Sequence, residues 1–180
     1  MENKNTIIMK KRIALVAHDS RKQELKEWVE YNKEILKYCE LYATGTTGTL
    51  LQECFLVEEP SIEIELPEGG VLSTADRNIT YTNTITRLHS GPLGGDQEIG
   101  SMIANGKLDV VIFFCDNLVT QGHAQDIQAL SRLASLYNIA YANNRTTADM
   151  IITSPLFTDE EYEMKIPGCI EKYADRFKKT

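Results

Sequence analysis

The chain has 180 residues, of which 42% are hydrophobic, and this suffices for one domain with a buried core. Its net charge of −7 argues against nucleic acid or an anionic membrane as partners, because these are bound largely through clustered lysines and arginines. The apolar runs are too short to cross a bilayer and no signal-peptide pattern is visible, so we expect a cytoplasmic protein. The four cysteines lie far apart, and we expect them to be reduced core residues without a metal or disulfide role.

The first part of the chain predicts two strand–loop–helix units. Residues Arg12–Ala17 form a short apolar strand that ends at His18, and apolar residues then recur at helical spacing up to Leu36. Ser20 and Gln23 fit a capping box, which would place Lys22 in the first turn of this helix. The second unit has a strand over residues 40–43, a loop over residues 44–48 and a short helix over residues 49–54.

The middle of the chain departs from this plan. Residues 62–66 alternate between apolar and acidic side chains, residues 67–70 favour a turn, and residues 79–88 are rich in Thr and Ile. We interpret residues 58–89, approximately, as a β-hairpin inserted in a connection. Its apolar face is expected to pack on the parent domain or on a neighbouring subunit, because an isolated hairpin is marginally stable in water.

The remainder of the chain returns to strands and helices. Helical spacing follows over residues 97–103, a continuous apolar strand over Val110–Phe114, a helix over residues 127–137, a strand over residues 139–142 and a helix over residues 147–152. Nearly all-apolar strands that alternate with helices predict an α/β fold. We expect a single domain over residues 1–180, with a doubly wound parallel sheet, helices on both faces and the inserted hairpin. Ligands then bind beyond the carboxyl ends of the strands.

Residues 44–48 have the composition of a phosphate-binding loop. Gly45 and Gly48 let the backbone approach a ligand, while hydroxyls and helix N-terminal amides can donate to an anion. The segment matches neither the Walker pattern nor the dinucleotide pattern, so nucleotide binding is not implied. A turn with a threonine as helix N-cap explains the segment equally well. Lys22 could neutralise a phosphate here, although a lysine in a first helical turn is more often a solvated surface residue.

Residues 90–96 form the sharpest segment of the chain. Three glycines and one proline make a rigid backbone that can approach a ligand closely and deliver one carboxylate, that of Asp96. Ser90 and the Gly91 amide can add donors to a phosphate. Alternatively, Asp96 serves as the N-cap of the helix behind it, and the two roles are compatible.

His123 lies in a loop between Asp116 and Asp126, so either carboxylate could orient its ring. A solvated loop histidine is the more frequent case, and Asp126 is equally suited to cap the helix that starts at Ile127. Asp109 precedes its strand at the opposite edge of the sheet, and we exclude it from the site.

Four separated segments, taken together, resemble the methylglyoxal synthase family. They are residues 16–19 with Lys22, residues 42–48, residues 90–97, and residues 113–116 followed by His123 and Asp126. They occur in the same order as in the family, from about Arg12 to the C-terminus, with the hairpin as an interruption. The combination is far more specific than any one segment.

The resemblance implies an enzyme that converts dihydroxyacetone phosphate to methylglyoxal and inorganic phosphate without a cofactor, generally as a homohexamer. Phosphate is then a product, and we expect it to inhibit as well, because the site of the leaving group must also recognise the free ion. Asp96 would be the base that removes a proton from the carbon next to the ketone. The residues implied in substrate contact are His18, Lys22, Thr44, Gly45, Thr46, Thr47, Ser90, Gly91 and His123, with Asp19, Asp116 and Asp126 in supporting catalytic positions.

This chemistry accounts for the residue types. Proton removal builds negative charge on the former carbonyl oxygen, and a donor such as neutral His123 is expected against that oxygen. Phosphate leaves if the loops hold its carbon–oxygen bond out of the enediolate plane. The donors of Thr46, Ser90 and Lys22, among others, would fix that torsion and accept the leaving charge.

Two other readings and two departures stay open at this point. A regulatory module of the same fold would bind a phosphorylated effector without chemistry, and an isomerase would act on the same triose phosphate with a different torsion. The family usually has a proline after the strand-end aspartate and an aspartate after the histidine, where this chain has Asn117 and Ala124. The role expected of Asp96 does not depend on either departure.

Overall fold

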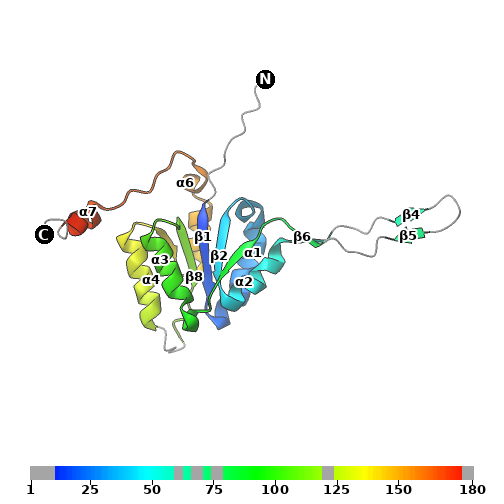
Figure 1. The fold of residues 1–180 in the computed structure, drawn as a ribbon, viewed down its shortest axis with the longest axis horizontal. Helices are drawn as coiled ribbons and strands as arrows, with labels where there is room; N and C mark the ends of the chain where they lie inside the picture. Colours follow the sequence, from blue (N-terminus) through cyan, green and yellow to red (C-terminus); the bar gives the residue numbers. More distant parts are fainter. Residues whose placement is uncertain (1–10, 59–62, 66–70, 74–78, 119–123, 176–180) are drawn as a thin grey trace, which may run out of the picture.

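A computed structural model describes residues 11–58, 63–65, 71–73, 79–118 and 124–175. At its centre is a five-stranded sheet in the order β7-β2-β1-β8-β9, in which every neighbouring pair is parallel (Figure 1). The strands are β1 (Arg12–Ala17), β2 (Glu40–Thr44), β7 (Ile85–Leu88), β8 (Val110–Phe114) and β9 (Ala140–Ala142). The parallel sheet predicted from the apolar strands is confirmed.

Helices cover both faces of this sheet. Successive residues of a strand point to opposite faces, and in β1 Ile13 packs with one core cluster while Ala14 packs with the other. The first cluster includes residues of α1 (Lys22–Leu36), α2 (Gly45–Gln52) and α5 (Arg145–Ile152). The second includes residues of α3 (Gly95–Ala104) and α4 (Ala124–Leu136). The fold is therefore doubly wound, as the sequence predicted.

Shorter elements complete the described chain. They are the 3-10 turns Asp19–Arg21, Glu53–Phe55 and Gly91–Leu93, and the helices α6 (Pro155–Thr158) and α7 (Gly168–Ala174). Cys39 and Cys115 are buried and Cys54 is half-buried, but Cys169 is exposed on α7. The prediction of a core position is therefore wrong for Cys169. Of the helices described, none is both long and apolar enough to span a membrane.

The inserted segment is antiparallel, but it ends earlier than predicted. β3 (Leu56–Glu58) pairs with β6 (Ile79–Tyr81), and β4 (Glu63–Glu65) pairs with β5 (Val71–Ser73). In Figure 1 these short strands lie to one side of the central sheet. Residues 85–88, predicted as part of the hairpin, instead form β7 and pair with β2. We call the segment from β3 to β6 the ribbon.

Asn83 and Gln52 explain why the ribbon ends where it does. The Asn83 side chain donates to the carbonyl oxygens of Leu36 and Cys39 at 3.0 and 2.9 Å, which ties residue 83 to the end of α1. Gln52 accepts from the Ile85 backbone N–H at 2.8 Å and donates to the Asn83 carbonyl at 2.9 Å. These long-range contacts return the chain to the sheet, and no local pattern reveals them.

Three helix starts differ from the prediction. α2 begins at Gly45 rather than residue 49, so the predicted loop is its first turn, with Thr44 as N-cap residue. α3 begins at Gly95 with Gly94 in the N-cap position, so Asp96 is not the cap. α4 begins at Ala124, which places Asp126 inside the first turn and makes its predicted capping role wrong.

The capping box predicted for the first helix is also wrong. Asp19–Arg21 form a 3-10 turn, α1 starts at Lys22, and no side chain caps it. Ser20 Oγ donates to Asp116 Oδ2 instead, at 2.5 Å, and Gln23 contacts Glu27. Lys22 nevertheless lies in the first turn, as predicted.

Candidate active site

A cavity of about 320 Å³ lies at the carboxyl edge of the sheet. It is surrounded by the segments that follow β1, β2 and β7, at the place where β1 is flanked by β2 on one side and β8 on the other. Such a reversal of strand order is where open α/β sheets bind ligands. The predicted site residues that line the cavity are His18, Asp19, Lys22, Thr44, Gly45, Thr46, Thr47, Ser90, Gly91 and Asp96.

Lys22 gives one end of the cavity a positive charge. Its Nζ donates to Thr46 Oγ1 at 2.6 Å and contacts Asp19 Oδ1 at 2.5 Å. The hydrogen bond from Lys22 holds the pKa of Asp19 below its ordinary value. Lys22 therefore joins the end of β1 to the first turn of α2, where backbone amides also favour an anion.

Gly45 brings two of the loops into direct contact. Its φ of +40° lies in the left-handed region, and a Cβ at this position would lie 2.8 Å from Ser90 Cβ. A side chain there would push the two loops apart, so the absence of one lets Ser90 lie against the start of α2. The hydroxyl-bearing segments after β2 and β7 thus form one wall.

Asp96 lies in the first turn of α3, at the same cavity. Its Oδ1 is buried within the protein. The residue before it, Gly95, is pressed against the preceding loop, because a Cβ there would lie 2.0 Å from the His89 carbonyl oxygen. The loop and the helix start are therefore packed too closely for any larger residue, and this packing fixes where the carboxylate lies.

His18 has a defined tautomer. Its Nδ1 accepts a hydrogen bond of 2.7 Å from the Asp116 backbone N–H, so the ring proton is on Nε2 and the imidazole is neutral. The ring also packs edge-on against Phe113, with 5.1 Å between centroids. His18 can therefore offer one N–H donor from the end of β1 to a ligand.

Asp116 supports this arrangement from behind the cavity and does not line it. Its carboxylate accepts from Ser20 Oγ at 2.5 Å and from the Leu118 backbone N–H at 2.9 Å. The loops after β1 and β8 are joined in this way, and His18 is held between them.

His123 lies outside the described residues, and the side chain of Asp126 is not described either. Ile127, one residue beyond Asp126, lines the cavity. Sequence reasoning missed this residue and the other apolar lining residues, which are Val16, Ala17, Pro92 and Phe113. Val16, Ala17 and Phe113 lie near strand ends, which was the available signal, but an apolar residue there has the same pattern as any core residue. Ile127 and Pro92 lie in α4 and in the turn after β7, where no such signal existed.

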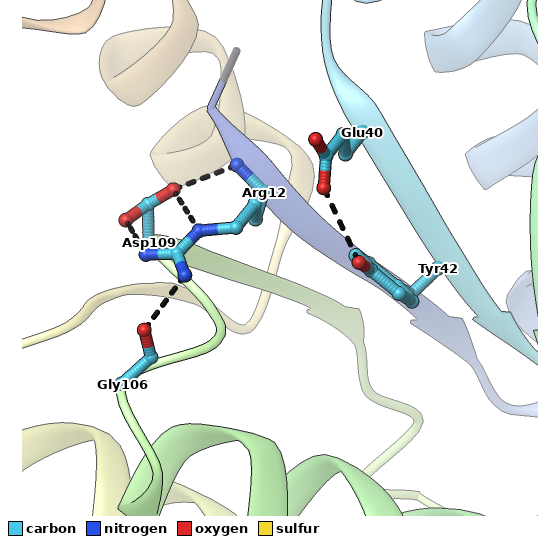
Figure 2. Close-up of polar contacts among 5 residues, drawn as sticks. All are labelled: Arg12, Glu40, Tyr42, Gly106 and Asp109. Carbon is cyan, nitrogen blue, oxygen red and sulfur yellow. Dashed lines mark hydrogen bonds and ion pairs between the residues drawn. The ribbon is translucent and has the colours of Figure 1, made fainter. Parts of the chain in front are cut away.

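A larger cavity, of about 820 Å³, lies at the amino edge of the sheet. Figure 2 shows its charged pair: Asp109 accepts from the Arg12 backbone N–H at 2.7 Å and from Nε and Nη2 at 3.0 and 2.7 Å. Arg12 Nη1 donates to the Gly106 carbonyl at 2.7 Å. Beside them, Tyr42 donates to Glu40 at 3.3 Å. Asp109 lies at the amino edge, as the sequence predicted. Arg12 is hydrogen-bonded to Asp109, and Tyr42 to Glu40.

The fold and the carboxyl-edge cavity define a small α/β protein whose ligand pocket places a lysine and hydroxyl-bearing loops beside a carboxylate. A family model described as MGS-like domain matches residues 69–143. The methylglyoxal synthase of Leptospira interrogans is 48% identical over 148 residues, which cover 82% of either chain. That of Pseudoalteromonas atlantica is 46% identical over 159 residues, which cover 88% of this chain and 98% of the relative.

A solved structure agrees with these relatives. The crystal structure of methylglyoxal synthase from Elizabethkingia anophelis NUHP1 matches with a TM-score of 0.68 and 37% identity, over 90% of this chain and 91% of that chain. The chain belongs to the methylglyoxal synthase family. The resemblance drawn from the four segments is thus confirmed, and the chain is an enzyme.

Proposed function

We propose that the carboxyl-edge cavity converts dihydroxyacetone phosphate to methylglyoxal and inorganic phosphate. The observation that carries the proposal is that Lys22 and the first turn of α2 border the same cavity as Asp96. A phosphate ester and the base that acts on its carbon chain then fit side by side. The relatives, which are named methylglyoxal synthases, support the same reaction.

The phosphate is bound at the cationic end. Lys22 supplies the charge, Thr46 and Thr47 supply hydroxyls, and the α2 amides add donors. Ser90 and the Gly91 amide complete the site from the opposite loop. Asp19, already paired with Lys22, orients the ammonium group.

Asp96 removes a proton from the substrate carbon that carries the free hydroxyl. The electrons of that bond form a carbon–carbon double bond, and the carbonyl electrons move to oxygen. Neutral histidine stabilises the resulting oxyanion: His18 offers its Nε2–H, and His123 is the second donor proposed from the family resemblance. Asp116 holds His18, and Asp126 is proposed to support His123.

Phosphate then leaves from the enediolate. The proton of the substrate hydroxyl first moves to the former carbonyl oxygen, so that the negative charge lies on the hydroxyl oxygen. If the carbon–oxygen bond to phosphate stands out of the enediolate plane, this oxygen forms an aldehyde C=O, the C=C electron pair shifts toward the carbon that bears phosphate, and phosphate leaves with the electron pair of its bond. Lys22 and the hydroxyl donors accept the charge. The enol that remains tautomerises to methylglyoxal. No electron donor or acceptor is needed, and the proposal includes no cofactor.

The wider setting follows the same resemblance. We propose a single domain over residues 1–180 with the ribbon as an insertion, assembly as a homohexamer in the cytoplasm, and inhibition by inorganic phosphate at the cationic end of the cavity. Free phosphate fits there because the site that accepts the leaving group also recognises the ion.

The test is to incubate the pure protein with dihydroxyacetone phosphate and to measure methylglyoxal, phosphate and glyceraldehyde phosphate. Equal release of methylglyoxal and phosphate supports the proposal. Glyceraldehyde phosphate as the main product identifies an isomerase, and binding without turnover identifies a regulatory module.

A further inference from the structure

His89 and Glu98 form a pair beside the active site that the mechanism above does not use. His89 follows β7 and precedes Ser90, and Glu98 lies in the first turns of α3, two residues after Asp96. We propose that Glu98, acting through His89, is a positioning residue that holds the Ser90 loop in place against the helix that carries Asp96. This inference rests on the proposed function of Asp96 and Ser90.

One carboxylate makes both contacts of the pair. Glu98 Oε2 accepts from the His89 backbone N–H at 2.9 Å, and Oε1 lies 2.8 Å from His89 Nδ1. The two residues are nine positions apart, and the loop between them contains Ser90, Gly91 and Asp96. The pair therefore closes a short ring around three of the proposed site residues.

Further contacts inside this ring restrict the backbone of the loop. The Ser90 carbonyl accepts from the backbone N–H groups of Leu93 and Gly95 at 2.9 and 3.1 Å. Gly95 fits against the His89 carbonyl only because it has no Cβ. Glu98 fixes the N–H side of the same residue, so His89 is held from both sides by α3.

β7, the strand that leads into the ring, is the element that this contact would hold in place. β7 lies at the edge of the sheet and is paired only with β2 among the described residues. It also follows the ribbon directly in sequence. Motion of an edge strand would shift Ser90 relative to Asp96, and a misplacement of about 1 Å between binding and catalytic groups can cost on the order of a hundredfold in rate.

The pair is placed for this role and not for binding substrate or for holding the core. Neither residue lines the cavity, and the side chains of His89 and Glu98 are 68% and 37% exposed. Exposed pairs contribute little to global stability. The pKa of Glu98 lies below its ordinary value, primarily because of the backbone hydrogen bond from His89, so the carboxylate is ionised near neutral pH.

Three substitutions test the inference. Glu98→Ala removes both contacts and is expected to lower kcat roughly tenfold, while KM stays within about twofold and Tm within about 4 °C. Glu98→Gln retains both, because its amide oxygen accepts from the His89 N–H and its amide nitrogen can donate to Nδ1. Glu98→Gln should keep at least about half of the wild-type kcat. His89→Ala keeps only the backbone contact and should fall between them.

Glu34→Ala is the matched control, because Glu34 also forms an exposed ion pair, with Lys37, and neither residue lines the cavity. Hydrogen exchange of residues 89–96 gives a readout that needs no turnover, and it should be faster in Glu98→Ala than in Glu98→Gln. If Glu98→Ala matches Glu34→Ala in both kcat and exchange, the inference is wrong. It is equally wrong if Glu98→Gln loses as much activity as Glu98→Ala. An inactive wild-type protein would instead overturn the proposed function, and the exchange data would still report whether Glu98 holds the loop.

Discussion

Cavities lie at both edges of the central sheet, and their polar atoms are arranged differently. At the amino edge, Arg12 and Asp109 bind each other through several hydrogen bonds, and the Gly106 carbonyl accepts a further hydrogen bond from the Arg12 guanidinium. At the carboxyl edge, the backbone is folded tightly around Gly45 and Gly95, which lets hydroxyls, amides, a lysine and a carboxylate border one smaller cavity. At the larger cavity, Arg12 and Asp109 are therefore paired with each other, whereas at the smaller one Lys22, itself paired with Asp19 and Thr46, borders the same opening as Asp96.

The difference shows that cavity size does not locate the chemistry. Hydrogen bonds between protein groups stabilise the fold, whereas groups gathered around an opening by close backbone packing can act on a ligand. If this distinction is right, substitutions at the carboxyl edge change turnover or phosphate binding, and substitutions at the amino edge change stability alone.

The largest effect is expected from Asp96→Asn. An amide is nearly isosteric with the carboxylate and cannot accept the substrate proton, so kcat should fall about 10³-fold while the fold and phosphate-ester binding are retained. Steady-state turnover and calorimetric binding of an unreactive analogue measure the two properties. Retention of a tenth of the activity would remove Asp96 from its proposed role.

Gly95→Ala should destabilise the loops at the carboxyl edge, because the added methyl group overpacks them. The new Cβ would lie 2.0 Å from the His89 carbonyl oxygen, and overpacking of this kind should lower the free energy of unfolding by about 2 kcal/mol or more. Chemical denaturation measures the change. Gly168→Ala is the control, since a Cβ there meets nothing within 4 Å. Equal stabilities of the two variants would show that the loop is not held as described.

Lys22→Ala should weaken inhibition by inorganic phosphate by at least about tenfold, because a charge-assisted hydrogen bond contributes roughly 1.5–3 kcal/mol. Phosphate titration of the wild-type protein and the variant gives the two inhibition constants. Unchanged inhibition would make Lys22 an ordinary surface lysine, paired with Asp19 and Thr46 but without a role in binding.

Arg12→Gln is the counterpart at the amino edge. The variant loses the ion pair with Asp109, whose side chain is 18% exposed, and should lose about 1 kcal/mol of stability. Its kcat and phosphate inhibition should equal those of the wild type. A change in phosphate inhibition would contradict the separation of the two edges.

Shortening the ribbon is also expected to have little effect on chemistry. Replacement of residues 59–78 with a short Gly/Ser linker leaves β7 in the sheet, so turnover per active site should stay within about twofold. Assembly or Tm should change more, because a two-stranded segment needs a surface to pack on. Light scattering and turnover on one preparation decide the matter. An inactive deletion protein with unaltered mass and Tm would make the ribbon part of the active site.

Sequence patterns predicted the elements whose own residues determine them. β1 matches its predicted range because an uninterrupted apolar run ends at a polar residue, and Asp96 stood out because three glycines closely precede it. The start of α2 was missed because glycine and threonine are weak helix formers, and tertiary contact with Ser90 and Arg87 overrides that preference.

Contacts between distant residues account for the other errors. Ser20 resembled a helix cap but donates to Asp116, 96 positions away. The bond from the Asp116 N–H to His18 spans 98 positions, so the histidine tautomer had no local signal. Residues 79–88 are rich in Thr and Ile, as a hairpin strand would be, and only the bonds from Gln52 and Asn83 reveal that residues 85–88 belong to the main sheet.

A crystal structure with an unreactive phosphorylated analogue of the enediolate tests the central claim most directly. The phosphate group should lie at Lys22 and Thr46, and the carbon chain beside Asp96, within the carboxyl-edge cavity. The amino-edge cavity beside Arg12 and Asp109 should hold no analogue. An analogue bound there, or one whose carbon chain lies out of reach of Asp96, would contradict the account.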